Sequence, residues 1–152
     1  MKTKLIDYAD NGPIFITGHV NPDGDALGSA FALKLFFDSQ NIISDVNFDI
    51  TTKLPSNLNH LPYHLISDDL KENYKTVFVF DCGNSSRLGK YEEVVLAAEN
   101  VVVIDHHVDP SFGEMYRLLI LMQRVQHKFC SDNLKMKILK LMMKWQTVYL
   151  QV

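Results

Sequence analysis

The sequence lacks the features that mark secreted and membrane-spanning proteins. Its 152 residues include only two cysteines, too few for a disulfide framework, so we expect a reducing, cytoplasmic location. No run approaches the roughly 18 apolar residues that a membrane span requires, and the first residues show no signal peptide. The net charge of -3 is too small to predict binding to nucleic acid or to a membrane surface. A hydrophobic content of 47% indicates that the chain can bury a core.

Glycine and proline are missing from the last part of the chain. Gly113 is the last of them, although at usual frequencies of about 7% and 5% the tail should hold roughly four or five. The stretch Met115 to Val152 has seven basic residues and one acid, a charge of +6, which leaves -9 for residues 1–114. We therefore predict two parts, 1–114 and 115–152. The second has the pattern of a basic amphipathic helix, with one face made by Leu118, Met122, Val125 and Phe129.

Three short apolar runs with β-type residues each end in carboxylates or histidines. Ile14–Thr17 leads into a loop with His19, Asp23 and Asp25; Thr76–Phe80 leads into Asp81; and Val101–Ile104 leads into Asp105, His106 and His107. In an open α/β sheet, ligands bind beyond the carboxyl ends of the strands, where residues far apart in sequence meet. An Asp-Gly-Asp stretch alone is usually a solvated turn. Three such ends in one short chain favour a common site instead.

Helical patterns separate these runs. We predict a helix capped by Asp25 and running to about Gln40, a second strand at Asp45–Ile50 and a short helix at Tyr91–Glu99, with Val101–Ile104 as the last strand that the pattern supports. For residues 51–73 we predict an irregular connection between the strands Asp45–Ile50 and Thr76–Phe80. Strands that alternate with helices indicate right-handed crossovers, and hence an α/β fold with a largely parallel sheet and flanking helices.

The residue types at the strand ends predict a metal site. Oxygen donors mixed with imidazole suit manganese or a related divalent ion. The carboxylates of Asp23 and Asp25 also repel each other unless a cation lies between them. With the donors from the other two strand ends, this set is typical of two-metal sites that hydrolyse phosphoesters. His107 would then contact the phosphate or protonate the leaving group.

Other polar residues have weaker signals. His60, His64 and His127 have no carboxylate at ligand spacing, so we interpret them as surface or packing residues. Cys82 lies beside the predicted site, but a small packing role fits it better than ligation. Arg87 could touch a phosphate, and an ordinary loop arginine at the surface is an equally good interpretation.

The stretches Gly18–Ser29, Asp81–Gly83 and Asp105–His107 resemble the first three motifs of the DHH phosphoesterases. The similarity covers about residues 10–114 and is greatest to the RecJ-like branch that includes nanoRNases, pAp phosphatases and cyclic-dinucleotide phosphodiesterases. It implies a phosphohydrolase with two manganese ions, for which Mg²⁺ or Co²⁺ could substitute. The substrate would be a nucleotide or short oligonucleotide. The protein would bind neither a membrane nor a stable protein partner.

The same resemblance implies a role for each site residue. Asp105 would orient a neighbouring ligand, and His107 would face the scissile phosphate. The implied metal ligands are His19, Asp23, Asp25, Asp81 and His106.

The tail departs from the family pattern, which continues with a fourth motif carrying another metal-binding aspartate and then a glycine-rich substrate domain. When the last base of each codon is read with the first two bases of the next codon, Met122–Gln123 forces alanine, Phe129–Cys130 forces leucine and Trp145–Gln146 forces alanine. With permitted codon choices, the shifted sequence resembles the family's own continuation. We therefore expect that the tail is family sequence in another frame. Two alternatives stay open: a truncated product without activity, or a binding module that uses the basic tail.

Overall fold

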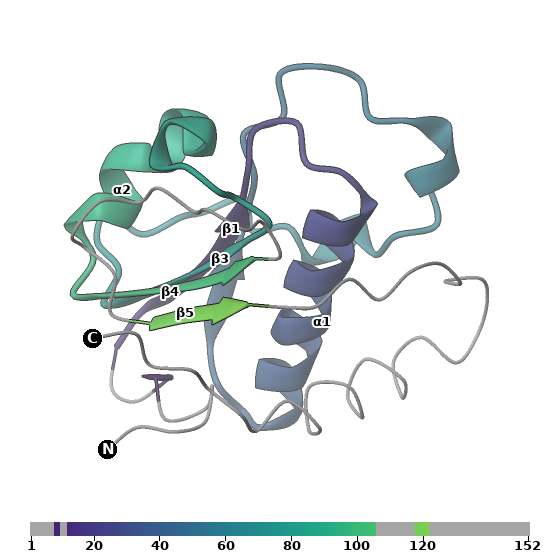
Figure 1. Ribbon diagram of the computed structural model, residues 1–152. Helices are drawn as coiled ribbons and strands as arrows, with labels where there is room; N and C mark the ends of the chain where they lie inside the picture. Colours follow the sequence, from purple (N-terminus) through teal and green to yellow (C-terminus); the bar gives the residue numbers. More distant parts are fainter. Residues whose placement is uncertain (1–7, 10–11, 106–117, 122–152) are drawn as a thin grey trace.

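The computed structural model describes residues 8–9 and 12–105, and the backbone of residues 118–121 (Figure 1). These residues form one parallel sheet with the strand order β2-β1-β3-β4-β5. This arrangement confirms the predicted α/β fold. The strands are β1 (Ile14–Gly18), β2 (Ser44–Val46), β3 (Thr76–Phe80), β4 (Asn100–Asp105) and β5 (Leu118–Leu121).

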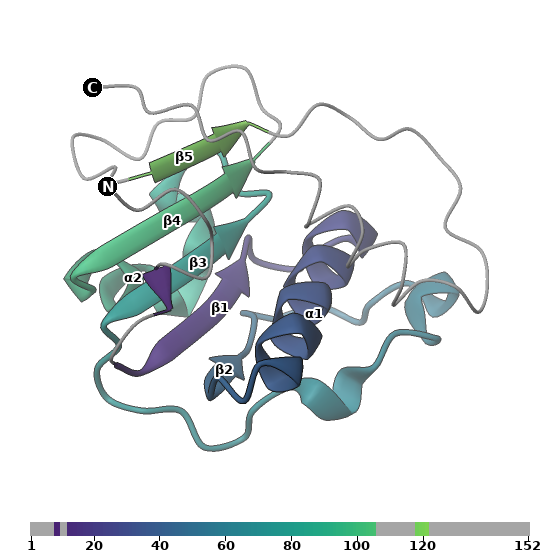
Figure 2. The same ribbon diagram turned by 90° about the horizontal axis from the view of Figure 1, so that it is seen from below.

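Helices lie on both faces of the sheet (Figures 1 and 2). The long helix α1 (Gly24–Ser39) connects β1 to β2 across one face. The short helix α2 (Glu92–Ala97) and the 3-10 segment η4 (Ser85–Tyr91) connect β3 to β4 across the other. Two further 3-10 turns, η2 (Ser56–Leu58) and η3 (Tyr63–Leu65), lie in the connection from β2 to β3.

The central strands β1, β3 and β4 consist mainly of apolar residues because both of their faces are covered. Successive side chains point to opposite faces, so each strand contributes to two cores. Ile16 and Phe78 pack in a cluster with Phe31 of α1, whereas Val79 packs in a second cluster with Val95 of α2. The three central strands are thereby held from both sides, which fixes the positions of their carboxyl ends.

The N-cap of helix α1 lies two residues earlier than we predicted. Asp23, and not Asp25, is its N-cap: Oδ1 of Asp23 accepts hydrogen bonds from the backbone N–H groups of Asp25 and Ala26, each at 3.0 Å. The reason is the backbone. Asp23 is extended, with φ −85° and ψ −173°, while Asp25 already lies in the first helical turn. The helix ends at Ser39 with Gln40 as its C-cap, close to the predicted end.

Strand β2 is shorter than the predicted strand Asp45–Ile50. Its outer edge is occupied by Ser67, whose N–H donates to the Val46 carbonyl at 2.8 Å and whose Oγ accepts from the Val46 N–H at 3.1 Å. After Val46 the chain leaves the ladder and becomes a loop. The helix predicted at Tyr91–Glu99 is present as the slightly shorter α2.

Strand β5 corrects two expectations. Leu118–Leu121 pairs in parallel with β4, from Val102↔Leu118 to Asp105↔Leu121, so this stretch is a strand where we predicted the start of a helix. It also adds a strand after Val101–Ile104, which the sequence pattern indicated as the last. The rest of the predicted helical tail lies outside the described residues. In the part of the chain that the structure describes, no helix has the length and apolar character needed to cross a membrane.

Candidate metal centre

The strand order creates a switch point between β1 and β3. The connection after β1 crosses one face of the sheet and the connection after β3 crosses the other, so the two loops diverge at the carboxyl ends of these strands. In open parallel sheets this divergence opens the crevice in which ligands bind. Gly18 pairs with Phe80, and Phe80 with Ile104. The next residues along each strand, His19, Asp81 and Asp105, therefore lie at one edge.

Backbone geometry brings β1 and β3 close together at this edge. A Cβ atom at Gly18 would lie only 2.8 Å from the carbonyl oxygen of Phe80, so glycine permits the approach. Just beyond it, Asn21 and Asp81 have positive φ angles of 50° and 51°. Such left-handed backbone is costly for most side chains but is tolerated by asparagine and aspartate. Strained turns of this kind concentrate at functional sites.

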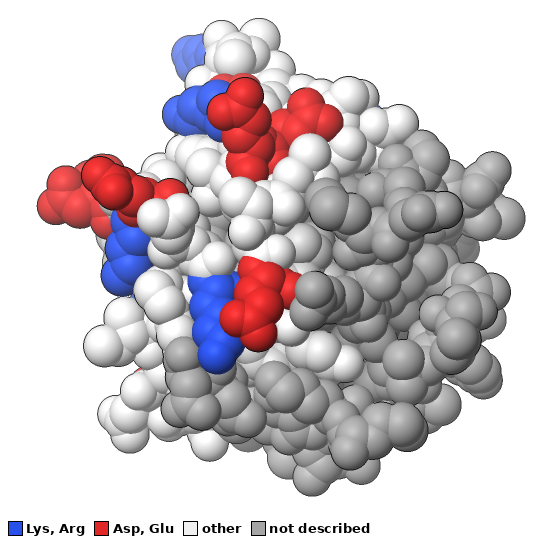
Figure 3. All heavy atoms as spheres, turned by 90° about the vertical axis from the view of Figure 1, so that its left-hand side faces the viewer, with Lys and Arg blue, Asp and Glu red and all other residues white. Residues whose placement is uncertain are grey.

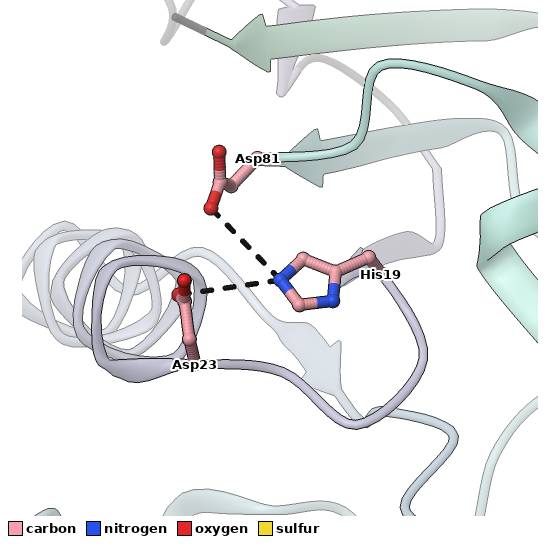
Figure 4. A group of neighbouring side chains, drawn as sticks. All are labelled: His19, Asp23 and Asp81. Atoms are coloured by element: carbon pink, nitrogen blue, oxygen red, sulfur yellow. Dashed lines mark ion pairs between the residues drawn. The ribbon is translucent and has the colours of Figure 1, made fainter. Parts of the chain in front are cut away.

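Three of the predicted ligands converge here (Figure 4). Nε2 of His19 lies 4.0 Å from Oδ1 of Asp23 and 3.9 Å from Oδ2 of Asp81. His19 is buried, the Asp81 side chain is 11% exposed and the Asp23 side chain is 61% exposed. The group is therefore closed on the β3 side and open on the side of α1.

The donor atoms fit a divalent cation. Nδ1 of His19 lies 2.9 Å from the Val20 carbonyl, and because a carbonyl only accepts, Nδ1 carries the proton. In the neutral ring, Nε2 then turns a lone pair toward two carboxylates, and all three groups are metal donors. These donor atoms lie within 4.8 Å of one another. Metal–ligand bonds of roughly 2.1 Å allow neighbouring donors about 3–4 Å apart, so small side-chain movements would bring all three donors within bonding distance of one ion.

The other predicted site residues are placed differently. Asp105 lies beside Asp81 at the end of β4 and is 1% exposed, but it is not part of the group of three. Asp25 is exposed in the first turn of α1 and also lies outside the group. Arg87 is exposed, and its carbonyl accepts a 2.7 Å hydrogen bond from the Val20 N–H. His106 and His107 lie outside the described residues.

Cys82 has the packing role that we predicted. It is fully buried in the core on the α2 side, and its Sγ donates to the Asn84 carbonyl at 3.1 Å. Burial raises the pKa of its thiol to about 11, so the thiolate that would bind a metal is scarce at neutral pH. His60 and His64 are exposed, which confirms their surface interpretation, while His127 lies outside the described residues.

Asn21 and Asp49 are structural elements of the site that sequence reasoning missed. The Asn21 N–H donates to the Asp49 carbonyl at 2.8 Å, and Oδ2 of Asp49 accepts from the Lys90 N–H at 2.9 Å. Gly89 has φ +59°, and a side chain there would collide with the Asp49 carboxylate. Asp49 thus links the loops that follow β1, β2 and β3. No sequence signal indicated these links, because they join residues 28 to 41 positions apart.

The face on the α2 side carries charges of both signs. Figure 3 shows acidic and basic side chains lying next to one another among the described residues of this face. A surface that binds a nucleic-acid backbone is expected to be uniformly positive, and the described part of this face is not.

An open parallel α/β sheet with imidazole and carboxylate donors at its switch point is an arrangement found in metal-dependent hydrolases. The family model "DHH family, N-terminal domain" matches residues 13–145, and the chain belongs to this family. The resemblance found in the three motifs is thereby confirmed, and the chain has the fold of a phosphoesterase family.

Known relatives agree with this assignment. The chain is 29% identical over 122 residues to uncharacterized protein MJ1633 of Methanocaldococcus jannaschii, a match that covers 76% of this chain and 24% of that protein. It is 26% identical over 121 residues to uncharacterized protein MJ0988 of the same organism, covering 78% and 36%. The chain thus spans about a quarter to a third of these curated relatives.

A solved structure shares the fold. The crystal structure of an exopolyphosphatase-related protein from Bacteroides fragilis superposes with a TM-score of 0.63 and 27% sequence identity. The match covers 76% of this chain and 36% of that protein. The likeness supports the assignment to a hydrolase family.

Proposed function

We propose that this chain carries the metal centre of a manganese-dependent phosphoesterase that hydrolyses esters of short oligonucleotides, dinucleotides or pAp-like nucleotides. The observation that supports this most is the convergence of His19, Asp23 and Asp81 at the β1/β3 switch point. The donor set suits Mn²⁺, with Mg²⁺ or Co²⁺ as substitutes. The nucleotide class comes from the resemblance to the nanoRNase and pAp phosphatase branch.

Each residue has a proposed role. A bound divalent ion would supply Lewis-acid polarisation of the phosphate and activation of water. His19 and Asp81 hold the buried side of the site and Asp23 its open side. Asp105, buried next to Asp81, orients that side chain.

The remaining proposed roles come from the family resemblance. Asp25 and His106 complete the ligand set for a second ion. His107 faces the scissile phosphate and gives a proton to the leaving group, and Arg87 adds a weaker phosphate contact. A cytoplasmic location is part of the same proposal.

Phosphate release tests the enzyme. The full chain is incubated with MnCl₂ and pAp or a dinucleotide, and products are measured with and without a chelator. We expect manganese-dependent turnover that Asp81→Asn abolishes and the exposed control Asp68→Asn leaves unchanged. Turnover that is the same in Asp81→Asn would contradict the proposal.

The same assay tests one alternative, a chain that binds metal without turnover. Manganese uptake with no product would support a chain that lacks enzymatic function. Liposome binding that depends on residues 115–152 would instead support a binding module.

The division at residue 114 is also a proposal. We infer that residues 115–152 derive from family sequence read in another frame. Strand β5 is compatible with this origin because its ladder uses backbone groups, which any reading frame supplies. Sequencing the gene tests the idea: the frame shifted by one base near codons 114 to 118 should stay open beyond codon 152. A stop codon soon after the shift would rule it out.

A further inference from the structure

One peptide unit connects the metal centre to the loop that follows β2. The carbonyl of Val20 lies 2.9 Å from Nδ1 of His19, and the N–H of Asn21 donates to the Asp49 carbonyl at 2.8 Å. This carbonyl and this N–H belong to the same trans peptide, in which they point in opposite directions across a rigid plane. Neither group can turn without the other, so the Asp49 carbonyl and the His19 ring depend on one orientation of the Val20–Asn21 peptide.

This orientation decides which ring nitrogen of His19 is free for a metal. The ring donates from Nδ1 to the Val20 carbonyl, so in the neutral ring Nε2 faces Asp23 and Asp81 with a lone pair (Figure 4). Two carboxylates attract a proton. If the carbonyl turned away, nothing would hold the proton on Nδ1, and the carboxylates would draw it to Nε2. A protonated Nε2 has no lone pair for an ion.

The backbone alone does not favour the observed orientation. Flipping a peptide changes ψ of the residue before it and φ of the residue after it, so a flip would take Asn21 from its φ of 50° to a negative φ. Negative φ is the region that most side chains prefer. Asn21 also precedes Pro22, which biases it further toward extended backbone with negative φ. Other interactions must therefore hold the peptide.

The loop after β2 supplies these interactions. Oδ1 of Asn21 accepts from the backbone N–H groups of Thr51 at 2.8 Å and of Thr52 at 2.9 Å. Its Nδ2 donates to Oγ1 of Thr51 at 2.9 Å. Together with the Asp49 carbonyl, this segment binds both the main chain and the side chain of Asn21. A left-handed conformation persists where the surroundings determine it in this way.

The segment η4 holds the same loop from the other side. The carbonyl of Arg87 accepts from the Val20 N–H at 2.7 Å, and the Lys90 N–H donates to Oδ2 of Asp49 at 2.9 Å. Gly89 permits the second contact, because a side chain there would collide with the Asp49 carboxylate. The peptides before and after Val20 are thus each held by a neighbouring loop.

We propose that Asn21 is a positioning residue of the metal centre, which fixes the Val20–Asn21 peptide so that Nε2 of His19 stays free to bind a metal. It acts through His19 and does not touch the ion. The inference rests on the proposed function for the ion, whereas the state of the His19 ring can be measured without metal.

Nitrogen NMR of the histidine rings tests the proposal in the metal-free full chain, at a pH where His19 is neutral. His19→Gln identifies the His19 signals. We expect the ring proton on Nδ1 in the wild type and largely on Nε2 in Asn21→Ala, which loses the side-chain bonds and the tolerance for positive φ. Asn21→Gly accepts positive φ but lacks these bonds, so it should lie between the two.

Asn41→Ala is the matched control. Asn41 is exposed, has a φ of 57° and lies beyond the last residue of α1, at the opposite end of the helix from Asp23. The same substitution there removes an asparagine from left-handed backbone without touching the metal loop. It should leave the proton on Nδ1. Urea midpoints confirm that each variant is folded, and Asn21→Gly carries the test if Asn21→Ala does not fold.

Manganese binding provides the second readout. Loss of an outer-shell partner lowers metal affinity 10–100-fold, so isothermal titration should show about tenfold weaker Mn²⁺ binding in Asn21→Ala and a change of less than about twofold in Asn41→Ala. A ring proton that stays on Nδ1 in Asn21→Ala overturns the proposal, even if Mn²⁺ binding is weaker, because the effect would then not pass through His19. An equal proton shift in Asn41→Ala also overturns it. If the wild type binds no Mn²⁺, the proposed function fails, while the ring signals still decide the role of Asn21.

Discussion

The two sides of the metal centre are built by different means. On the β3 side, Asp81 follows a central strand, and sheet pairing together with burial sets its position. On the α1 side, Asp23 is 61% exposed and is positioned because its carboxylate caps the helix. The sheet thus provides a rigid, closed half, and the helix start provides an open half that also borders a cavity of about 390 Å³.

Breaking the closed half should have the largest effect. Asp81→Asn removes the charge of the buried carboxylate but keeps a residue that tolerates φ +51°. Loss of an outer-shell partner typically lowers metal affinity 10–100-fold, so loss of a ligand should cost at least about 100-fold in the Mn²⁺ dissociation constant. Isothermal titration measures it, with Asp68→Asn as the matched control. An affinity within a factor of two of wild type would show that the β3 side does not hold the ion.

Burial next to the closed half should also protect the thiol of Cys82 from alkylation. A pKa raised by burial from its ordinary value of 9 to about 11 lowers the thiolate fraction about 100-fold at pH 8. In a Cys130→Ser background, iodoacetamide should alkylate the native chain at least 100-fold more slowly than the urea-unfolded chain.

The same shift predicts a pH dependence of stability. The native state holds the Cys82 proton more tightly than the unfolded state, so this contribution is complete below pH 9 and is lost as the pH rises toward 11. Urea midpoints between pH 8 and 11 measure it. Fast alkylation of the folded chain at pH 8 would contradict the described burial.

The open half should separate metal binding from stability. Asp23→Asn keeps a good N-cap but removes the charge, so we expect about tenfold weaker Mn²⁺ binding with unchanged stability. Asp23→Ala removes both and should also lower the free energy of unfolding by about 1 kcal/mol. Urea denaturation and metal titration of the pair test this. Equal Mn²⁺ binding by Asp23→Asn and wild type would restrict Asp23 to capping.

Asp25 should give the smallest effect on the first ion. It lies outside the group of three, so Asp25→Asn should change the first Mn²⁺ dissociation constant by less than about twofold while weakening a second binding event. Titrations that resolve both events decide the question. A large effect on the first event would place Asp25 in the primary site.

The sequence predicted those parts that depend on local pattern. The apolar runs at Ile14–Thr17 and Thr76–Phe80 became central strands, and parallel pairing then placed His19 and Asp81 together. The choice between Asp23 and Asp25 as helix cap was wrong because both are good caps and the backbone turn decides between them. The outer edge of β2 is hydrogen-bonded to Ser67, a contact 21 residues away that no local pattern reveals.

The ties made by Asn21 and Asp49 were beyond sequence reasoning for a similar reason. The sequence pattern places Asn21 in the loop after Ile14–Thr17 and Asp49 in the predicted strand Asp45–Ile50. Their actual roles follow from hydrogen bonds between loops that meet only after the sheet has formed. Such positions are set by tertiary contacts, which single-sequence patterns do not encode.

The most direct test of the metal centre is pulsed electron paramagnetic resonance of the chain with one equivalent of Mn²⁺. Our account predicts coupling of the ion to an imidazole nitrogen, and predicts that His19→Gln and Asp81→Asn each reduce this coupling or the amount of bound Mn²⁺. An unchanged spectrum and unchanged Mn²⁺ uptake in both variants would contradict a site formed by His19, Asp23 and Asp81.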